Sequence, residues 1–338
     1  MNLINIREVI ARPEYTFLHK NERLRGHIMF VTFGGSHAYG TNVEGSDIDV
    51  RGCVAATENE LLGLEKFEQF LDNQTDTTIY AFPKLIGLLT NCNPNTIELL
   101  GCRPDSYGMV SPAGRLLLDN AKLFLSQRCV KSFGGYAYQQ LARLESAVAQ
   151  RTPDAAEKER YILNACRSAM DHFGDRYQVL PEGGVRLRIG DGKSEPDEIV
   201  LDVDLHGYPL RDYRSMWREM NEIARNFGKL DQRNRKKDDV HLAKHMMHLI
   251  RLYLMCLDIL EQEEIVTHRE KDRELLMSIR NGAYMDADGR VIPEFYDLLH
   301  GLQGRFEYAK NNTSLPKEPD MKRINELTVT INKMSIGL

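Results

Sequence analysis

The chain has 338 residues, a length that predicts about two domains and enough material to bury a substantial core. Hydrophobic residues make up 42% and charged residues 28%, which is typical of a globular protein and excludes a disordered or collagen-like chain. The 44 basic and 49 acidic residues give a formal net charge of -5. This balance excludes a general basic coat for duplex nucleic acid, although a local basic groove remains compatible with it.

The six cysteines are scattered, and none forms a Cys-x-x-Cys pair, so the sequence gives no support for a structural zinc site. No apolar run approaches the roughly 20 residues that a membrane-spanning helix needs, so no membrane association is expected. Without a recognisable signal peptide, the expected location is the reducing cytoplasm.

The first part of the chain, residues 1–125, mixes strand and helix patterns. The continuous apolar run 28–33 predicts a buried strand, because it ends at a pair of glycines. Segments 47–56 and 77–82 predict two further strands, since alternating, β-branched and aromatic residues favour extended backbone. Segment 84–89 predicts a helix that begins at a proline. We expect a small domain of strands and helices here.

From about residue 115, apolar residues recur with helical spacing, which predicts a mainly helical domain over residues 126–338. Two strands around a turn rich in Gly, Lys, Ser and Pro are expected near residues 183–206, as a β insertion in this domain. The predicted helices cover residues 116–124, 136–149, 155–173, 214–225, 240–261, 272–280 and 293–309.

The stretch from Gly34 to Asp49 carries the strongest indication of chemistry. The first strand leads through Gly34 and Gly35 into Ser36 at the start of a short helical turn. Free N–H groups and the serine hydroxyl in such a turn favour phosphate oxygens. The next predicted strand carries Asp47 and Asp49, which project to the same side if both lie on the strand.

Two neighbouring carboxylates repel each other unless a cation lies between them, and hard oxygen ligands suit Mg²⁺ or Mn²⁺. A phosphate-binding turn that faces a carboxylate pair is what metal-assisted nucleotidyl transfer requires. Either feature alone is common, as an ordinary turn or as a solvated strand end. The prediction depends on their order and separation.

This stretch resembles the nucleotide-binding motif of the DNA polymerase β-like nucleotidyltransferase superfamily, in which Gly-Ser is followed by Asp-x-Asp. The chain is also similar to a group of predicted bacterial and phage nucleotidyltransferases, over about residues 15–285. The further matching segments are 75–80, 93–98, 133–137, 244–251 and 278–282.

The resemblance implies an α+β fold: a minimal nucleotidyltransferase mixed sheet with flanking helices, joined to a C-terminal helical domain with a small β excursion. It implies transfer of an NMP group from an NTP, with ATP the expected nucleotide, to an acceptor hydroxyl with release of pyrophosphate. The acceptor stays open between a nucleic-acid end, an oligonucleotide and a protein. The alternative is a catalytically silent nucleotide-binding module with a regulatory role.

The superfamily usually adds a third carboxylate from a neighbouring strand. Asp76 is the first candidate, because it precedes the predicted strand 77–82 and would complete the metal site and orient the attacking hydroxyl. Glu98 is its rival, although a buried, paired glutamate that packs the two domains explains this residue equally well. Asp72 is the third candidate.

Lys244, His248 and Arg251 follow a spacing that places them on one face of a helix. In polymerase β-like enzymes, lysines of the helical partner domain bind the triphosphate, which implies nucleotide binding here. The alternatives are a solvated face for Lys244 and an interior position for His248. Tyr39 and Arg51 flank the acidic stretch. Each of them is explained equally well by contact with the nucleotide or acceptor and by plain packing.

Three further features of the sequence carry weaker indications of chemistry. The alternating acidic segment 202–206 predicts either a metal site or an exposed strand. The basic run 233–237 predicts either contact with a nucleic-acid backbone or a solvated loop. Arg280 is a candidate for an anion contact.

Overall fold

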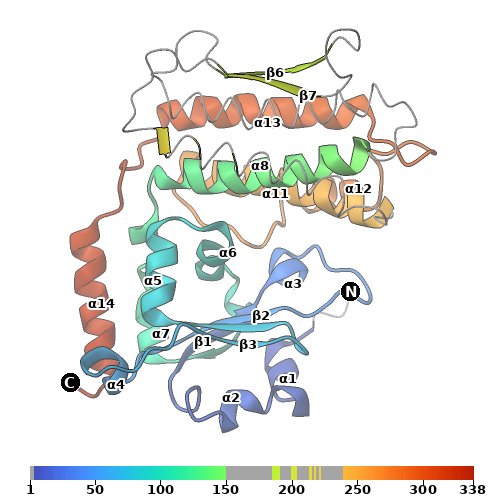
Figure 1. Ribbon diagram of the computed structural model, residues 1–338. Coiled ribbons are helices and arrows are strands. Elements are labelled where there is room, and N and C mark those ends of the chain that lie inside the picture. Colours follow the sequence, from blue (N-terminus) through green and yellow to red (C-terminus); the bar gives the residue numbers. More distant parts are fainter. Residues whose placement is uncertain are drawn as a thin grey trace. The chain divides into compact units, whose positions relative to one another are not determined.

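The computed structural model in Figure 1 describes residues 4–149, 185–190, 199–203, 213–214, 217, 221 and 239–338. The chain divides into two compact units. The first unit comprises Met1–Tyr136, Ile250–Met277 and Leu299–Leu338, and the second comprises Ala137–Leu249 and Ser278–Leu298. The predicted domain boundary between residues 125 and 126 stays a prediction.

The first unit is built on a mixed sheet, which has five strands within the described residues, in the order β3-β4-β2-β1-β5 (Figure 1). The β2 and β4 strands are parallel, and the other neighbouring pairs are antiparallel. The bounds are β1 (Ile28–Phe33), β2 (Val50–Val54), β3 (Gln69–Asp72), β4 (Thr77–Ala81) and β5 (Tyr107–Val110). The predicted strands at 28–33 and 77–82 are confirmed. The strand predicted over 47–56 is wrong at its start, because β2 begins only at Val50.

Helices cover both faces of this sheet, so that all six residues of β1 are buried. Figure 1 shows α1 (Ile6–Ile10) and α2 (Phe17–Lys20) on one side and α5 (Phe82–Thr90) on the other. The α1 and α2 helices contribute Ile6, Val9 and Leu18 to one apolar cluster with Val31 and Ile79. Burial on both faces explains why the β1 sequence is continuously apolar rather than alternating.

The remaining helices of the first unit are short, apart from the last. They are α3 (Gly35–Tyr39), α4 (Glu58–Leu62), α6 (Pro94–Ile97), α7 (Pro112–Asp119) and α14 (Met321–Ser335). The α5 helix confirms the helix predicted at 84–89, with proline in its first turn. The α14 helix was not predicted from the sequence.

Four further helices carry the helical part of the chain. They are α8 (Arg128–Ala149), α11 (Asp239–Gln262), α12 (Arg273–Arg280) and α13 (Pro293–Asn312). The strands β6 (Val185–Ile189) and β7 (Ile199–Val203) pair antiparallel where two strands were predicted. The fold is therefore α+β, as predicted. The predicted helix 155–173, most of 214–225 and the basic run 233–237 lie outside the described residues.

None of the helices in the described ranges combines the length and the apolar character that crossing a membrane requires. The expected cytoplasmic location stays a prediction.

Candidate active site

Asp49 and Asp76 occupy equivalent positions at the starts of two neighbouring strands. The β2 and β4 strands are parallel, and Val50 pairs with Thr77, so each aspartate directly precedes the first residue of its strand. The Val50 N–H donates to the Asp76 carbonyl at 3.2 Å, which joins the two strand starts. The pKa of the Asp76 carboxyl is lowered, chiefly by a hydrogen bond with the Asp49 side chain and further by the Arg51 charge. The register thus brings two of the predicted metal ligands together.

The predicted phosphate-binding turn packs directly on Asp49. The Gly34 N–H donates to the Asp49 carbonyl at 2.8 Å, and α3 begins at the next residue. A Cβ atom on Gly35 would lie 1.8 Å from Asp49 Oδ2, and Gly35 has a φ of +53°. A Cβ atom on Gly34 would lie 2.8 Å from Cγ of Arg51. Both positions therefore require glycine, and Ser36 follows in the first turn of the helix.

Asp47 lies in the loop before β2, with an exposed side chain. Because the strand begins at Val50, strand alternation does not fix Asp47 on the same side as Asp49, contrary to the expectation from sequence. Within the described ranges, no group of three or more His, Cys, Asp or Glu side chains is arranged to hold a metal ion. The predicted metal role of Asp47, Asp49 and Asp76 stays a prediction, and it depends first on the pair at the strand starts.

A guanidinium group already joins this carboxylate pair. Arg51 Nη2 lies 3.2 Å from Asp49 Oδ1 and 3.0 Å from Asp76 Oδ1. Its Nη1 donates to the Asp76 carbonyl and, at 3.0 Å, to the Val50 carbonyl. The position between the two carboxylates therefore accepts a cation. Its oxygen donors are of the kind that Mg²⁺ and Mn²⁺ prefer, so the pair fits the expected metal.

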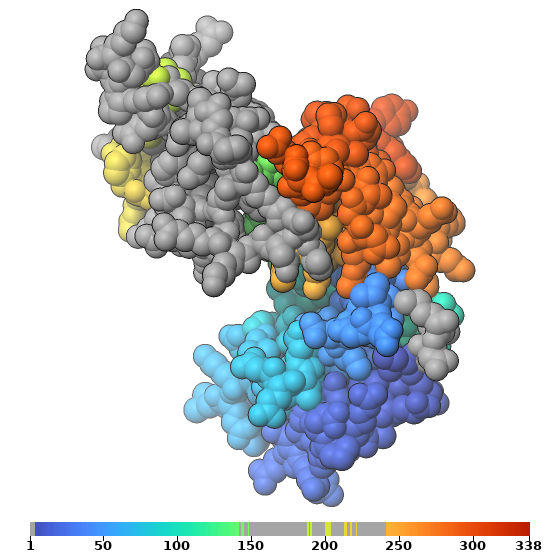
Figure 2. All heavy atoms as spheres, turned by 90° about the vertical axis from the view of Figure 1, so that its right-hand side faces the viewer, coloured from blue at the N-terminus to red at the C-terminus, as the bar shows by residue number. Residues whose placement is uncertain are grey.

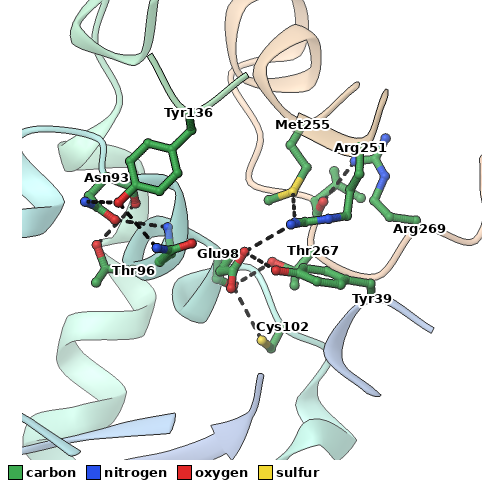
Figure 3. A network of polar contacts seen from close by, with 12 residues as sticks. Tyr39, Asn93, Thr96, Glu98, Cys102, Tyr136, Arg251, Met255, Thr267 and Arg269 are labelled. Carbon is green, nitrogen blue, oxygen red and sulfur yellow. Dashed lines mark hydrogen bonds and ion pairs between the residues drawn. The ribbon is translucent and has the colours of Figure 1, made fainter. Parts of the chain in front are cut away.

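Glu98 lies in a buried polar network rather than beside the aspartates (Figure 3). The Tyr39 hydroxyl donates to Glu98 Oε2 at 2.5 Å, and Arg251 Nη1 lies 3.4 Å from the same oxygen. The Arg251 guanidinium carbon stands 3.7 Å from the centre of the Tyr39 ring. Burial raises the pKa of Glu98, and the charge of Arg251 opposes this rise. The structure thus gives Glu98 buried partners, and the predicted roles of Tyr39 and Arg251 in nucleotide binding stay predictions.

The segment between α11 and α12, together with the first residue of α12, holds this network against α3. The Thr267 hydroxyl donates to the Glu98 carbonyl at 2.6 Å, and the Arg269 N–H donates to the Tyr39 carbonyl at 2.9 Å. Arg273 Nε donates to the carbonyl of Gly40, which ends α3, at 2.9 Å. In Figure 2 the blue chain around α3 lies against the orange chain of this segment. Sequence reasoning missed these contacts, because they join positions at least 169 residues apart in the chain.

The Asn-Pro-Asn segment positions the turn that carries Glu98. Asn93 caps α6, because its side chain accepts a hydrogen bond from the Asn95 N–H at 3.0 Å. The side-chain amides of Asn93 and Asn95 donate to the Tyr136 hydroxyl at 3.2 and 3.3 Å (Figure 3). The Asn-Pro-Asn segment, which belongs to the sequence resemblance over 93–98, therefore has a structural role as the cap of α6.

The predicted cationic face lies on α11, which confirms the helix expected at 240–261. Lys244 is exposed, His248 is half-buried and Arg251 is buried. Lys244 and His248 belong to the second compact unit, whereas Arg251 belongs to the first. Their binding of the triphosphate stays a prediction.

Two other predicted carboxylates have local partners. The Asp72 carboxylate accepts hydrogen bonds from the Thr75 N–H at 2.9 Å and from the Thr75 hydroxyl at 2.6 Å, as is usual in a turn. Asp202 pairs with Arg188 across the β6-β7 hairpin at 2.7 Å. The other candidate ligands of that segment, at positions 204 and 206, lie outside the described residues.

Comparison with known proteins agrees with this geometry. Residues 11–169 match the model of a family described as "RNA repair pathway DNA polymerase beta family". The match places this part of the chain in the polymerase β-like nucleotidyltransferase superfamily, which confirms the resemblance seen in the sequence. The matched range includes Asp49, Asp76 and Glu98 but neither Lys244 nor Arg251. No curated protein and no solved structure matches the chain.

Proposed function

We propose that the protein is a metal-dependent nucleotidyltransferase, which transfers an NMP group from an NTP to an acceptor hydroxyl and releases pyrophosphate. One observation carries the proposal: the glycine turn at the start of α3 packs on Asp49, and the strand register sets Asp76 beside it. Membership of the superfamily supports nucleotidyl transfer in general. The metal, the nucleotide and the acceptor belong to the proposal.

In this proposal each residue has a defined role. The amide groups of Gly35 and Ser36, with the Ser36 hydroxyl, hold phosphate oxygens of the NTP. Asp49 and Asp76 hold Mg²⁺ or Mn²⁺, and Asp47 joins them from the exposed loop. The bound cation supplies positive charge that favours attack on the α-phosphorus and departure of pyrophosphate. Asp76 also orients the attacking hydroxyl of the acceptor.

The favoured acceptor is the 3′-hydroxyl end of an RNA. The description of the matched family names an RNA repair pathway. A nucleic-acid end is one of the three acceptors that the sequence leaves open. ATP is the expected nucleotide. Oligonucleotide synthesis and transfer to a protein are the competing outcomes of the test.

The alternative function is a catalytically silent nucleotide-binding module. One observation favours it: Arg51 already pairs with both carboxylates that would hold the metal. A module of this kind would bind an NTP through the glycine turn without turning it over.

The test is incorporation of label from α-³²P-labelled NTPs, measured together with pyrophosphate release. The reactions contain Mg²⁺ or Mn²⁺ and an RNA with a free 3′-hydroxyl, with the same RNA blocked by a 3′-phosphate as the acceptor control. Asp47→Asn, Asp49→Asn and Asp76→Asn are compared with the wild type. Oligonucleotide and protein acceptors are assayed in parallel.

We expect label to enter only the RNA with the free hydroxyl and to fall at least about 100-fold in Asp49→Asn and Asp76→Asn, since removal of a group that stabilises transition-state charge has effects of this order. Equal pyrophosphate release by the wild type and all three variants, with every acceptor, contradicts the proposal. Tight ATP binding without turnover supports the silent module instead.

A further inference from the structure

Arg51 stands where its charge interacts with both proposed metal ligands. It follows Asp49 by two residues, and its guanidinium lies beside the Asp49 carboxylate at the start of β2. One nitrogen, Nη2, lies within 3.2 Å of a carboxylate oxygen of each aspartate. Asp49 and Asp76 thus share the single positive charge of Arg51 at the starts of β2 and β4.

Arg51 also holds the backbone of the turn before β4. Its Nη1 donates to the Asp76 carbonyl, and Asp76 has a φ of +44°, an uncommon conformation for a residue with a side chain. The side chain of Arg51 reaches this turn by lying along Gly34, where its Cγ atom occupies the space that a Cβ would need. The Arg51 side chain therefore passes beside the predicted phosphate-binding turn, with its Nε atom 3.6 Å from the position of a Cβ on Gly34.

We propose that Arg51 is an internal counter-ion that competes with the divalent cation for Asp49 and Asp76. The guanidinium holds the two carboxylates together while no cation is bound, and it leaves them when the cation binds. The released guanidinium then pairs with a phosphate of the NTP at the adjacent glycine turn. This inference rests on the proposed function, because it concerns the cation and the NTP that the proposed enzyme requires.

The charge of Arg51 should affect cation binding and nucleotide binding in opposite directions. A guanidinium carries one positive charge and a divalent cation carries two, so they repel each other when they share the same carboxylates. For charges about 5 Å apart in a water-like dielectric, removal of the guanidinium charge is expected to strengthen cation binding about tenfold. The planar guanidinium suits phosphate oxygens, so the same removal is expected to weaken NTP binding. The two effects have opposite signs, which a merely structural arginine would not produce.

The test uses the full chain and two probes. Binding of Mn²⁺ without nucleotide is measured by electron paramagnetic resonance, and binding of α,β-methylene-ATP with Mg²⁺ is measured by calorimetry. The variants are Arg51→Gln, Arg51→Lys and Asp49→Asn. Arg305→Gln is the matched control, because Arg305 pairs with the carboxylate of Glu261, away from the two strand starts in the chain. Circular dichroism establishes that each variant is folded.

We expect Arg51→Gln to bind Mn²⁺ about tenfold more tightly and the nucleotide analogue at least about tenfold more weakly than the wild type, by the charge argument above. Arg51→Lys keeps the charge but not the planar fork, so its Mn²⁺ affinity stays near that of the wild type while its nucleotide affinity falls. The Arg305→Gln variant is expected to match the wild type in both measurements. If Arg51→Gln does not fold, Arg51→Lys provides the test. Unchanged Mn²⁺ affinity with weaker nucleotide binding in Arg51→Lys supports the proposal, and equal changes in both affinities contradict it.

The outcomes separate this inference from the proposed function. Unchanged or weaker Mn²⁺ binding in Arg51→Gln, with loss of Mn²⁺ binding in Asp49→Asn, overturns the role of Arg51 alone. If Asp49→Asn binds Mn²⁺ as tightly as the wild type, Asp49 is not a ligand of the cation, and both proposals then fail.

Discussion

Replacing Arg251 by methionine tests how strongly the buried network stabilises the first compact unit. Arg251 is buried, with its Nη1 atom 3.4 Å from Glu98 Oε2 and its guanidinium carbon 3.7 Å from the centre of the Tyr39 ring. Methionine fills much of the same volume without the charge. The substitution therefore leaves the Glu98 carboxylate buried, with the Tyr39 hydroxyl as its remaining side-chain partner in Figure 3.

Loss of one partner of a buried ion pair lowers the free energy of unfolding by about 3–5 kcal/mol, because the other charge stays desolvated. The pH dependence has a defined sign. Burial raises the pKa of Glu98 in the folded protein, so its favourable contribution is present at pH values below the unfolded pKa and is lost as the pH rises through the folded pKa. Without Arg251 the folded pKa rises further. The cost of Arg251→Met should therefore be larger at pH 8 than at pH 5.

The measurement is urea unfolding followed by circular dichroism at both pH values, with amide exchange of β1 and β2 to report on the first unit. Arg305→Met is the control, because the Arg305 and Glu261 side chains form an exposed pair, whose loss typically costs less than about 1 kcal/mol. A double variant, Glu98→Gln with Arg251→Met, should lose less stability than the sum of the two single variants. A cost below about 1 kcal/mol for Arg251→Met, or strict additivity, refutes the reasoning.

Two further variants examine the two ends of α3. Gly35→Ala introduces a Cβ atom 1.8 Å from Asp49 Oδ2 at a φ of +53°, so we expect a loss of about 1–3 kcal/mol in stability and a loss of Mn²⁺ binding. Its control is Gly87→Ala in α5, where a Cβ atom meets nothing within 4 Å among the described atoms; unchanged Mn²⁺ binding in both variants contradicts the prediction. Tyr39→Phe removes the 2.5 Å hydrogen bond to Glu98 and should lower the free energy of unfolding by about 1.5–3 kcal/mol in thermal melts, with no change in the NTP KM. A raised KM with unchanged stability would instead indicate direct nucleotide contact.

The sequence predicted the central elements of the fold better than its edges. The β1 strand was predictable because burial on both faces makes it continuously apolar, and α5 because proline marks its start. The edge strands β3 and β5 have only four residues each and weak patterns, so they were missed. The start of β2 was placed too early, because the alternation at 47–49 continues into the strand although the ladder begins at Val50.

The candidate site was predictable in its residue types but not in its pairing. The order of Gly34, Gly35 and Asp49 in the sequence indicated phosphate and cation chemistry. That Asp76 lies beside Asp49 depends on the parallel register of β2 and β4, which no local pattern encodes. The pairing of Arg51 with both carboxylates was not predicted, because the sequence placed Arg51 only as a neighbour of the acidic stretch. The partners of Glu98 come from residues far along the chain, so its burial could be suspected but its network could not be derived.

The two clusters of polar residues are joined by one short helix. The α3 helix has five residues, and its first residue packs on Asp49 while its last, Tyr39, donates to Glu98. A helix of this length has little freedom to move at one end while it stays fixed at the other. The buried network therefore positions the glycine turn against the carboxylate pair, and catalysis is sensitive to such displacements because reacting groups must meet within a narrow range of geometry. On this argument Arg251→Met should lower kcat even where the variant remains folded, although Arg251 is buried in the network and not beside the carboxylate pair.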